Sequence, residues 1–173
     1  MLEEYRNKRL QELKQKAVLD RHGEVLEIVK DDWVREVTDG SNASAVVVHL
    51  YENSMVECQL MDEALARLAP RFKYIKFLRI KYNQAIENWP ERNLPTLFVY
   101  EKGALKTQLI TLNSVGGKTM KTEDLEWFLA KNNVITDSEL DENPREEDRK
   151  QVKKTNVYGS RRTGLDSDDE NDD

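Results

Sequence analysis

The chain has 173 residues, of which 35% are charged and 38% hydrophobic. This length suffices for one domain with its own core, and the polar balance predicts that part of the chain stays unfolded. The net charge of −6 falls on residues 137–173, which hold 13 acidic and 7 basic side chains and leave 20 of each before them. We therefore expect a neutral domain followed by an acidic tail.

Several protein classes are excluded by the same inventory. No apolar run approaches the ~20 residues of a membrane helix, and the N-terminus lacks the basic-then-apolar order of a signal peptide. A single cysteine, Cys58, excludes an internal disulfide, and with only two histidines a structural zinc site is not expected. We expect a soluble, cytoplasmic protein, with a nuclear one as the alternative, that binds no membrane, metal or cofactor.

Residues 1–22 are predicted to form a basic amphipathic helix. The segment contains six Lys or Arg side chains and four acidic ones. Its apolar residues form a broken stripe, which consists of Leu2, Tyr5, Leu10, Leu13 and Ala17. Such a stripe is too thin for deep burial. We favour a solvated or loosely docked helix, with a dedicated partner-binding helix as the alternative.

Short apolar runs alternate with helical periods from Gly23 onwards. The pattern predicts a strand at 25–29, a short helix that an Asp caps and that stops at Gly40, and a strand at 43–51. The last of these has no polar alternation, which is typical of a strand covered on both faces. A helix through residues 60–69 and a strand at 74–80 complete a β-α-β unit with parallel strands.

The second half of the pattern is different. Residues 82–94 are predicted to form a loop or one weak helical turn, and Pro95 opens a strand that pairs with 105–112 in a hairpin. A helix then begins at Thr122 as its N-cap. The domain is expected to span 23–135. Residues 136–173 contain only five clearly apolar side chains, so we expect a disordered acidic tail.

This order of elements resembles the thioredoxin fold, an α/β three-layer arrangement with a mixed central sheet. Leu94-Pro95-Thr96 is similar to that fold's cis-proline step. The resemblance places Cys58 at the second cysteine of the redox motif and Met55 at the nucleophilic first. Pro95 is then a structural cis-proline, and Met55 and Cys58 are vestigial redox positions.

Methionine at position 55, in place of a nucleophilic cysteine, decides the expected chemistry. Disulfide exchange needs an activated thiolate and a second thiol, and methionine supplies neither. We therefore favour an inert, buried Cys58, with a single-cysteine oxidoreductase as the alternative. His49 lies in a strand expected to be buried, and Gly116-Gly117 lacks the surrounding pattern of a phosphate loop. We predict that the chain is not an enzyme.

Several segments resemble the phosducin-like proteins. They are residues 23–28, the Leu-x-x-Leu-Lys end of the preceding helix, His49-Leu50-Tyr51, residues 89–100, Asp124–Trp127 and the acidic end. The chain is most similar to the phosducin-like 2 and 3 branch, also described as viral inhibitor-of-apoptosis-associated factors. The resemblance implies a redox-inactive co-chaperone that binds the cytosolic chaperonin TRiC/CCT and modulates the folding of actin, tubulin and related clients.

The ends of the chain qualify this resemblance. Family members usually carry a longer acidic helical segment before the basic helix, so we expect a truncated or shortened member. Because that segment contributes to G-protein βγ binding in the family, we do not favour this function and keep it as an alternative. Ser167 lies in Ser-Asp-Asp-Glu, a candidate site for an acidophilic kinase of the casein kinase 2 type. The basic helix and acidic tail either steer partner encounter or only solubilise the chain. Basic residues interleaved with acids argue against nucleic-acid binding, and we expect a monomer.

Overall fold

The structure of the protein is a computed structural model that describes residues 1–146. Its first compact unit spans Met1–Glu139. Ser167 and the acidic end lie outside the described residues. The first element is α1 (Leu2–Leu19), which confirms the predicted N-terminal helix.

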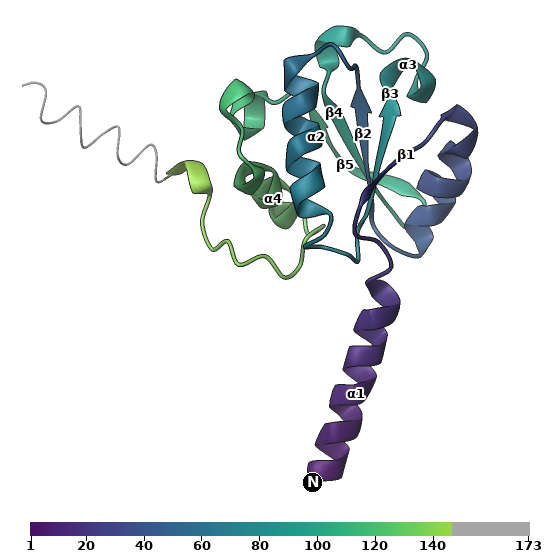
Figure 1. Cartoon of the computed structure of the whole chain (residues 1–173), viewed down its shortest axis with the longest axis vertical. Coiled ribbons are helices and arrows are strands. Elements are labelled where there is room, and N and C mark those ends of the chain that lie inside the picture. Colours follow the sequence, from purple (N-terminus) through teal and green to yellow (C-terminus); the bar gives the residue numbers. More distant parts are fainter. Residues whose placement is uncertain (147–173) are drawn as a thin grey trace, which may run out of the picture. The chain divides into compact units, whose positions relative to one another are not determined.

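A five-stranded mixed sheet forms the centre of the domain, as Figure 1 shows. The strand order is β1-β3-β2-β4-β5; β3 runs parallel to both β1 and β2, whereas β2–β4 and β4–β5 are antiparallel. The strands are β1 (Val25–Glu27), β2 (Val46–Tyr51), β3 (Lys76–Lys81), β4 (Thr96–Glu101) and β5 (Ala104–Ile110). All six residues of β2 are buried, which confirms the strand predicted to be covered on both faces.

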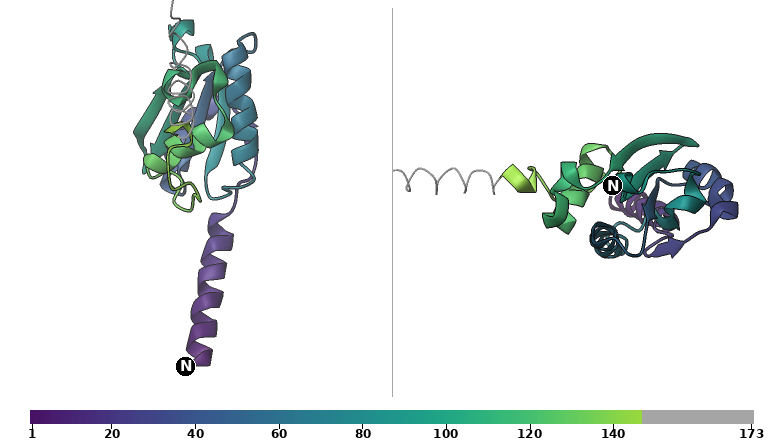
Figure 2. Two further views of the ribbon diagram at one scale, coloured as in Figure 1. Left: turned by 90° about the vertical axis from the view of Figure 1, so that its left-hand side faces the viewer. Right: turned by 90° about the horizontal axis from the view of Figure 1, so that it is seen from above.

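Two layers cover this sheet (Figures 1 and 2). On one face, α2 (Val56–Leu68) and α4 (Thr122–Lys131) pack with Val47, Phe77 and Leu97 into one apolar cluster. On the other face, Val46 and Val48 pack against the helical segment 30–42 and α3 (Tyr82–Ala85). Successive strand side chains point to opposite faces, so one continuous apolar run supplies both clusters.

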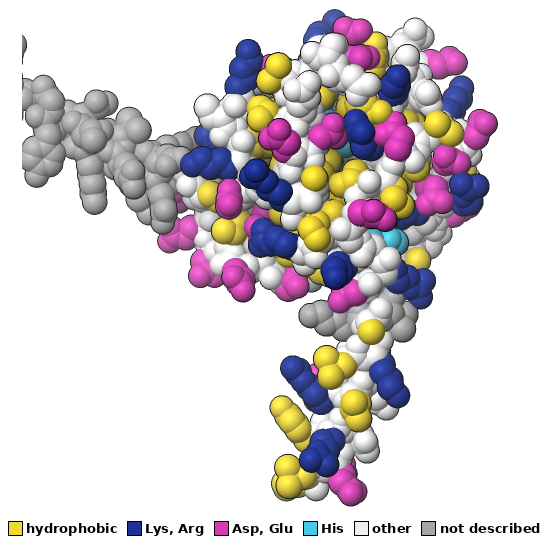
Figure 3. All heavy atoms as spheres, in the orientation of Figure 1, with side chains coloured by type: hydrophobic (Ala, Val, Ile, Leu, Met, Phe, Trp, Pro, Cys, Tyr) yellow, Lys and Arg dark blue, Asp and Glu magenta, His cyan; other side chains and the backbone are white. Residues whose placement is uncertain are grey.

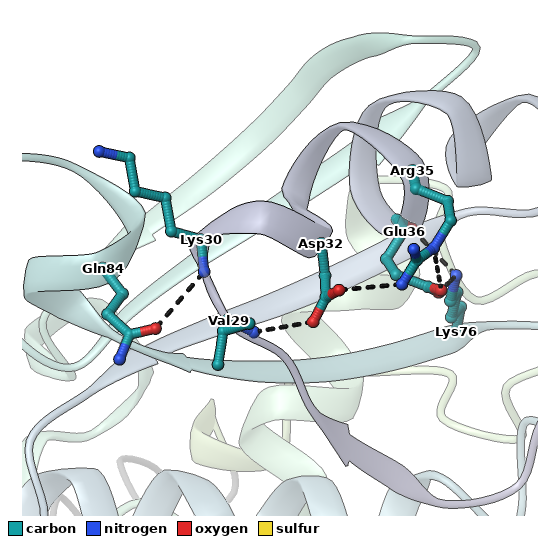
Figure 4. A network of polar contacts seen from close by, with 7 residues as sticks. All are labelled: Val29, Lys30, Asp32, Arg35, Glu36, Lys76 and Gln84. Carbon is teal, nitrogen blue, oxygen red and sulfur yellow. Dashed lines mark hydrogen bonds and ion pairs between the residues drawn. The ribbon is translucent and has the colours of Figure 1, made fainter.

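One short helix that ends at Gly40 was predicted within the segment 30–42. The segment consists instead of a 3₁₀ turn (Lys30–Asp32), a π-type turn (Val34–Asp39) and a second 3₁₀ turn (Gly40–Asn42). Figure 4 shows the contacts that hold it. The Asp32 carboxylate accepts the Val29 N–H at 3.2 Å, and Lys76 of β3 pairs with Glu36 and donates to its carbonyl oxygen at 3.0 Å. The contacts with Lys76 join the segment to the sheet.

Ser41 joins the same segment to the β4–β5 hairpin. Only 2% of Ser41 is exposed, and its hydroxyl donates to the Thr38 carbonyl oxygen at 2.7 Å. The hydroxyl oxygen accepts the Gly103 N–H at 2.8 Å, and the Ser41 carbonyl oxygen accepts the Lys102 N–H at 2.9 Å. Gly103 has a φ of +80°, which glycine adopts without a Cβ clash. The predicted hairpin turn is thus fixed from outside the hairpin.

Short 3₁₀ turns form the remaining connections: Glu91–Asn93, Asn113–Val115 and Gly117–Thr119. The prediction that Thr122 caps α4 was wrong. Lys121 occupies the N-cap, and the carboxylate of Asp124, three residues on, accepts the Lys121 N–H at 2.8 Å. The acceptor thus comes from the first turn of the helix and reaches back, which leaves Thr122 as the first helical residue.

Candidate functional site

The N-terminus of α2 is the place where a thioredoxin fold would carry thiol chemistry. Met55 stands at the N-cap with extended backbone, and Cys58 follows within the first turn of the helix. Cys58 is only 1% exposed and is the one free cysteine of the chain. A buried thiol in this position has no access to a bulky disulfide substrate.

The electrostatic environment of Cys58 also opposes reactivity. Burial raises the pKa of the Cys58 thiol above its ordinary value, and the negative charges of Asp62 and Glu57 act in the same direction. A hydrogen bond with the backbone of Glu52 lowers that pKa but is outweighed. Reactive cysteines have the opposite shift, because the thiolate is the nucleophile. The arrangement therefore favours a thiol that stays protonated.

Apolar side chains surround this position. Met55 packs against the same cluster that contains Cys58, Leu94 and Phe98. The Leu94–Pro95 peptide bond is cis, and the neighbouring Trp89 ring meets Phe98 edge-on with ring centroids 5.7 Å apart. Among the predicted site residues, the structure thus brings Met55 and Cys58 into one cluster with the residue before Pro95.

A polar network that the sequence reasoning missed lies between α2 and the sheet. His49 Nδ1 is 2.9 Å from an Asp62 carboxylate oxygen, and the other oxygen of Asp62 accepts from Arg79 at 3.2 Å. Arg79 Nε lies 3.4 Å from Glu27, whose carboxylate accepts the hydroxyl of Tyr51. The Arg79 guanidinium also stacks over the Tyr51 ring, 3.9 Å from its centroid. We call these five residues the β2–α2 network.

Burial sets the protonation of this network. His49 is fully buried, which lowers its pKa although Asp62 acts in the raising direction. Its Nε2 has no hydrogen-bond partner within residues 1–146. Burial and the hydrogen bond to Glu27 raise the pKa of Tyr51 to about 12. Neutral His49 therefore donates from Nδ1 to Asp62, and the network serves to hold β1, β2, β3 and α2 together.

Two sequence signals point to this network in retrospect. Residues 47, 49 and 51 share one face of β2, and the first of them packs under α2. Asp62 lies one turn after buried Cys58, so it projects from the same side of the helix. His49 and Asp62 are thus polar residues at positions where the pattern predicts apolar side chains, which indicates that the two side chains contact each other.

The exposed side chains form a mixed surface. In Figure 3 the Lys and Arg side chains alternate with Asp and Glu over the visible face of the domain, and the hydrophobic side chains are scattered between them. Helix α1 differs, because it exposes large apolar side chains along its length; those nearest its N-terminus are Leu2 at 81%, Tyr5 at 70%, Leu10 at 53% and Leu13 at 51%. Arg6 and Arg9 interrupt this stripe at helical spacing. We call this surface the α1 stripe; it is the candidate partner-binding surface.

Residues 1–146 carry neither a candidate metal site nor a candidate membrane span. No group of three or more His, Cys, Asp or Glu side chains is arranged to hold a metal ion there. No helix in this part of the chain has the length and apolar character needed to cross a membrane.

Comparison with solved structures defines the class of the fold. The chain is similar to thioredoxin f from spinach chloroplast in its long form, with 17% identity and a TM-score of 0.52 over 68% of this chain and 93% of that one. Thioredoxin f2 in complex with ferredoxin:thioredoxin reductase matches with 18% identity and a TM-score of 0.52, over 65% of this chain and 98% of that one. The protein therefore has a thioredoxin fold, as predicted.

The sequence comparisons identify the family within this fold. The Phosducin family matches residues 1–156, so the chain belongs to that family. It is 41% identical over 145 residues to phosducin-like protein 2 of Dictyostelium discoideum, covering 84% of this chain and 60% of the relative. Phosducin-like protein 3 of Danio rerio is 37% identical over 171 residues, covering 99% and 71%. The predicted similarity to the phosducin-like 2 and 3 branch is confirmed, and the chain spans 60% of the Dictyostelium relative's length.

Proposed function

We propose that this chain is a redox-inactive co-chaperone of the cytosol that binds the chaperonin TRiC/CCT and modulates the folding of actin- and tubulin-type clients. Membership of the phosducin family supports this proposal. The observation that carries it is the N-terminus of α2, where a methionine and a buried, high-pKa cysteine stand at the two positions that we predict to be vestigial redox positions.

The chemistry behind this reasoning is that of thiol exchange. A thiolate must attack a disulfide sulfur, and a second thiol must then resolve the mixed disulfide. The Met55 thioether cannot ionise, and the Cys58 thiol is buried with a raised pKa. The fold therefore keeps its three layers and its cis Leu94–Pro95 bond while the reaction centre is filled with packed side chains. What such a domain offers is a rigid surface for binding.

Contact with a large partner is assigned to the α1 stripe. Exposed leucines with arginines between them suit a partner surface that offers apolar contacts and acidic side chains together to one face of a helix. Each apolar side chain removed from water contributes roughly 1.5–3 kcal/mol when fully buried, and the arginines speed encounter with an acidic surface. Leu10 and Leu13 lie one turn apart and are both about half exposed, so they are the residues to change first.

Binding of the full chain to purified TRiC/CCT in a sizing assay tests the proposal. The unchanged chain should co-migrate with the chaperonin, and a Leu10→Asp/Leu13→Asp double variant should bind at least about tenfold more weakly, since two buried leucines are lost. Val34→Asp is the matched control, because Val34 is an exposed apolar residue of the domain at 62%. The same column reports whether the free chain runs as a monomer.

The alternatives are separated by further measurements on the same samples. Failure of the unchanged chain to co-migrate with the chaperonin refutes the proposal. Capture of G-protein βγ instead would make the chain a βγ-binding regulator. Rapid alkylation of Cys58 at pH 6 would revive the single-cysteine oxidoreductase, because it requires a lowered thiol pKa.

A further inference from the structure

The chain stays attached to the domain after α4 ends. Val134 and Ile135 are 4% and 3% exposed, and their N–H groups donate to the Leu129 carbonyl oxygen at 2.9 and 3.2 Å. The next three residues, 136–138, have no apolar anchor of their own. We call residues 136–138 the strap. The sequence prediction ended the domain at 135, whereas the compact unit extends to Glu139.

Polar contacts with Tyr74 and Glu126 hold the strap. The Thr136 N–H donates to the Tyr74 hydroxyl oxygen at 3.1 Å, and that hydroxyl donates to the Asp137 carboxylate at 2.6 Å. The Ser138 hydroxyl donates to a carboxylate oxygen of Glu126 at 3.0 Å. Segments held by a few polar contacts and without buried apolar side chains open locally at low free-energy cost.

Glu126 is an unusual acceptor for this contact. Only 2% of the residue is exposed although it lies on α4. Arg71 neutralises it through two contacts of 3.2 Å, one to each carboxylate oxygen. The Ser138 hydroxyl adds a third donor to the same carboxylate. The strap is therefore fastened to a buried negative charge.

The residues around Ser138 are acidic. Asp137 precedes it, and Glu139, Asp141 and Glu142 follow. Kinases select substrates by charge patterns complementary to their grooves, so this sequence suits a kinase with a basic substrate groove. Ser138 is half-buried in a stretch without helix or strand, and local opening of the strap presents it in extended form. We propose that Ser138 is a phosphorylation site for an acidophilic protein kinase and that its modification releases the strap from the domain.

The reaction uses ATP as phosphoryl donor. Ser138 Oγ attacks the γ-phosphorus, a new O–P bond forms, and the bond from that phosphorus to the β,γ-bridging oxygen breaks. ADP leaves with the bond's electron pair, and the hydroxyl proton passes to the carboxylate base of the kinase. No oxidant or reductant takes part.

Release of the strap follows from the change in hydrogen-bonding groups. Phosphoserine has lost the proton that Ser138 donates to Glu126, and at pH 7 it carries a charge of about −1.5 to −2. Two groups that only accept hydrogen bonds then face each other, one of them buried. Arg71 pairs with both oxygens of the Glu126 carboxylate and shares its positive charge with it, so repulsion from that carboxylate moves the phosphate away and takes the strap with it.

This inference is independent of chaperonin binding, and its test uses the full chain. A Ser167→Ala variant removes the acidophilic site predicted in the acidic end, and it is incubated with casein kinase 2 and ATP. Mass spectrometry should find a phosphate on Ser138. The amide hydrogen exchange of Thr136, read by NMR, should then rise by at least about tenfold, because its hydrogen bond to Tyr74 is lost.

Two further variants make the result specific. Ser138→Ala in the same background should take up no phosphate and should show no kinase-dependent change in exchange. Glu126→Gln keeps the side-chain size but removes the charge, so phosphorylation of Ser138 should raise exchange by a smaller factor. The inference is overturned if the phosphate goes to Thr136 or if Ser138 stays unmodified. It is equally overturned if phosphorylated Ser138 leaves the exchange of Thr136 unchanged.

Discussion

Replacing Asp62 by alanine tests the reading of the β2–α2 network as a structural device. Asp62 is the only residue of the network that contacts both His49 and Arg79 through its two carboxylate oxygens. In the Asp62→Ala variant His49 Nδ1 loses its hydrogen-bond partner while the imidazole stays inside the sheet. Because Nε2 already lacks a partner within residues 1–146, both ring nitrogens would then be buried and unpaired.

The expected size of the effect follows from these contacts. A buried polar group left unpaired costs about 1–3 kcal/mol. The Arg79–Asp62 pair is about one-third exposed on both sides, so solvent screening limits its share to about 0.2–1 kcal/mol. We expect a loss of about 2–3 kcal/mol in the free energy of unfolding. At roughly 4 °C per kcal/mol for a domain of this size, Tm should fall by about 10 °C.

Urea unfolding of four variants provides the measurement. The His49→Leu background removes the orphaned imidazole, so Asp62→Ala should cost less than about 1 kcal/mol there, the share of Arg79 alone. Glu63→Ala, an exposed neighbour on α2, should change stability by less than about 0.5 kcal/mol. A coupling energy between His49 and Asp62 below about 0.5 kcal/mol would show that the reasoning is wrong.

Three further outcomes are expected. The pKa of His49 is lowered in the folded state from its ordinary 6.5. The contribution of neutral His49 to stability is therefore complete above pH 6.5 and is lost as the pH falls further. Urea titrations at pH 7.5 and 5.5 should show this loss, and the loss should be smaller in the His49→Leu variant. Cys58 should react with iodoacetamide at pH 7 at least about tenfold more slowly in the folded chain than in urea, because burial raises its pKa; equal rates contradict an inert thiol. Leu65→Ala should cost about 2–5 kcal/mol, since Leu65 is fully buried between α2 and the sheet, and thermal unfolding measures it.

The order of strands and helices could be predicted because runs of apolar residues mark most of the strands and the buried faces of the helices. The run 43–51 has no polar alternation, and the structure places its residues 46–51 at the centre of the sheet with both faces covered, whereas 43–45 precede the strand. The same reasoning ended the domain at Ile135, the last buried apolar residue before the strap. It could not find residues 136–138, because they carry no apolar side chain and form polar contacts with Tyr74 and Glu126.

The candidate site was predicted less completely. The burial expected for His49 is confirmed, but its partner Asp62 was not found, because charged helix residues are ordinarily solvated. The form of the segment 30–42 depends on Lys76 of a distant strand, which local periodicity does not report. The vestigial redox roles of Met55 and Cys58 came from resemblance to a family and stay predictions.

The position of β2 has a consequence for synthesis of the protein. Its two neighbours are β3 and β4, and β4 begins at residue 96, fifty residues after β2 begins at residue 46. At about 5–20 residues per second, a ribosome needs roughly 3–10 s to make that stretch. During this interval the most apolar strand of the chain has one edge open to other chains, the condition that leads to aggregation. The nascent chain is thus itself exposed to the aggregation that co-chaperones prevent in their clients, and the open edge of β2 is paired only after the β4–β5 hairpin has been synthesised.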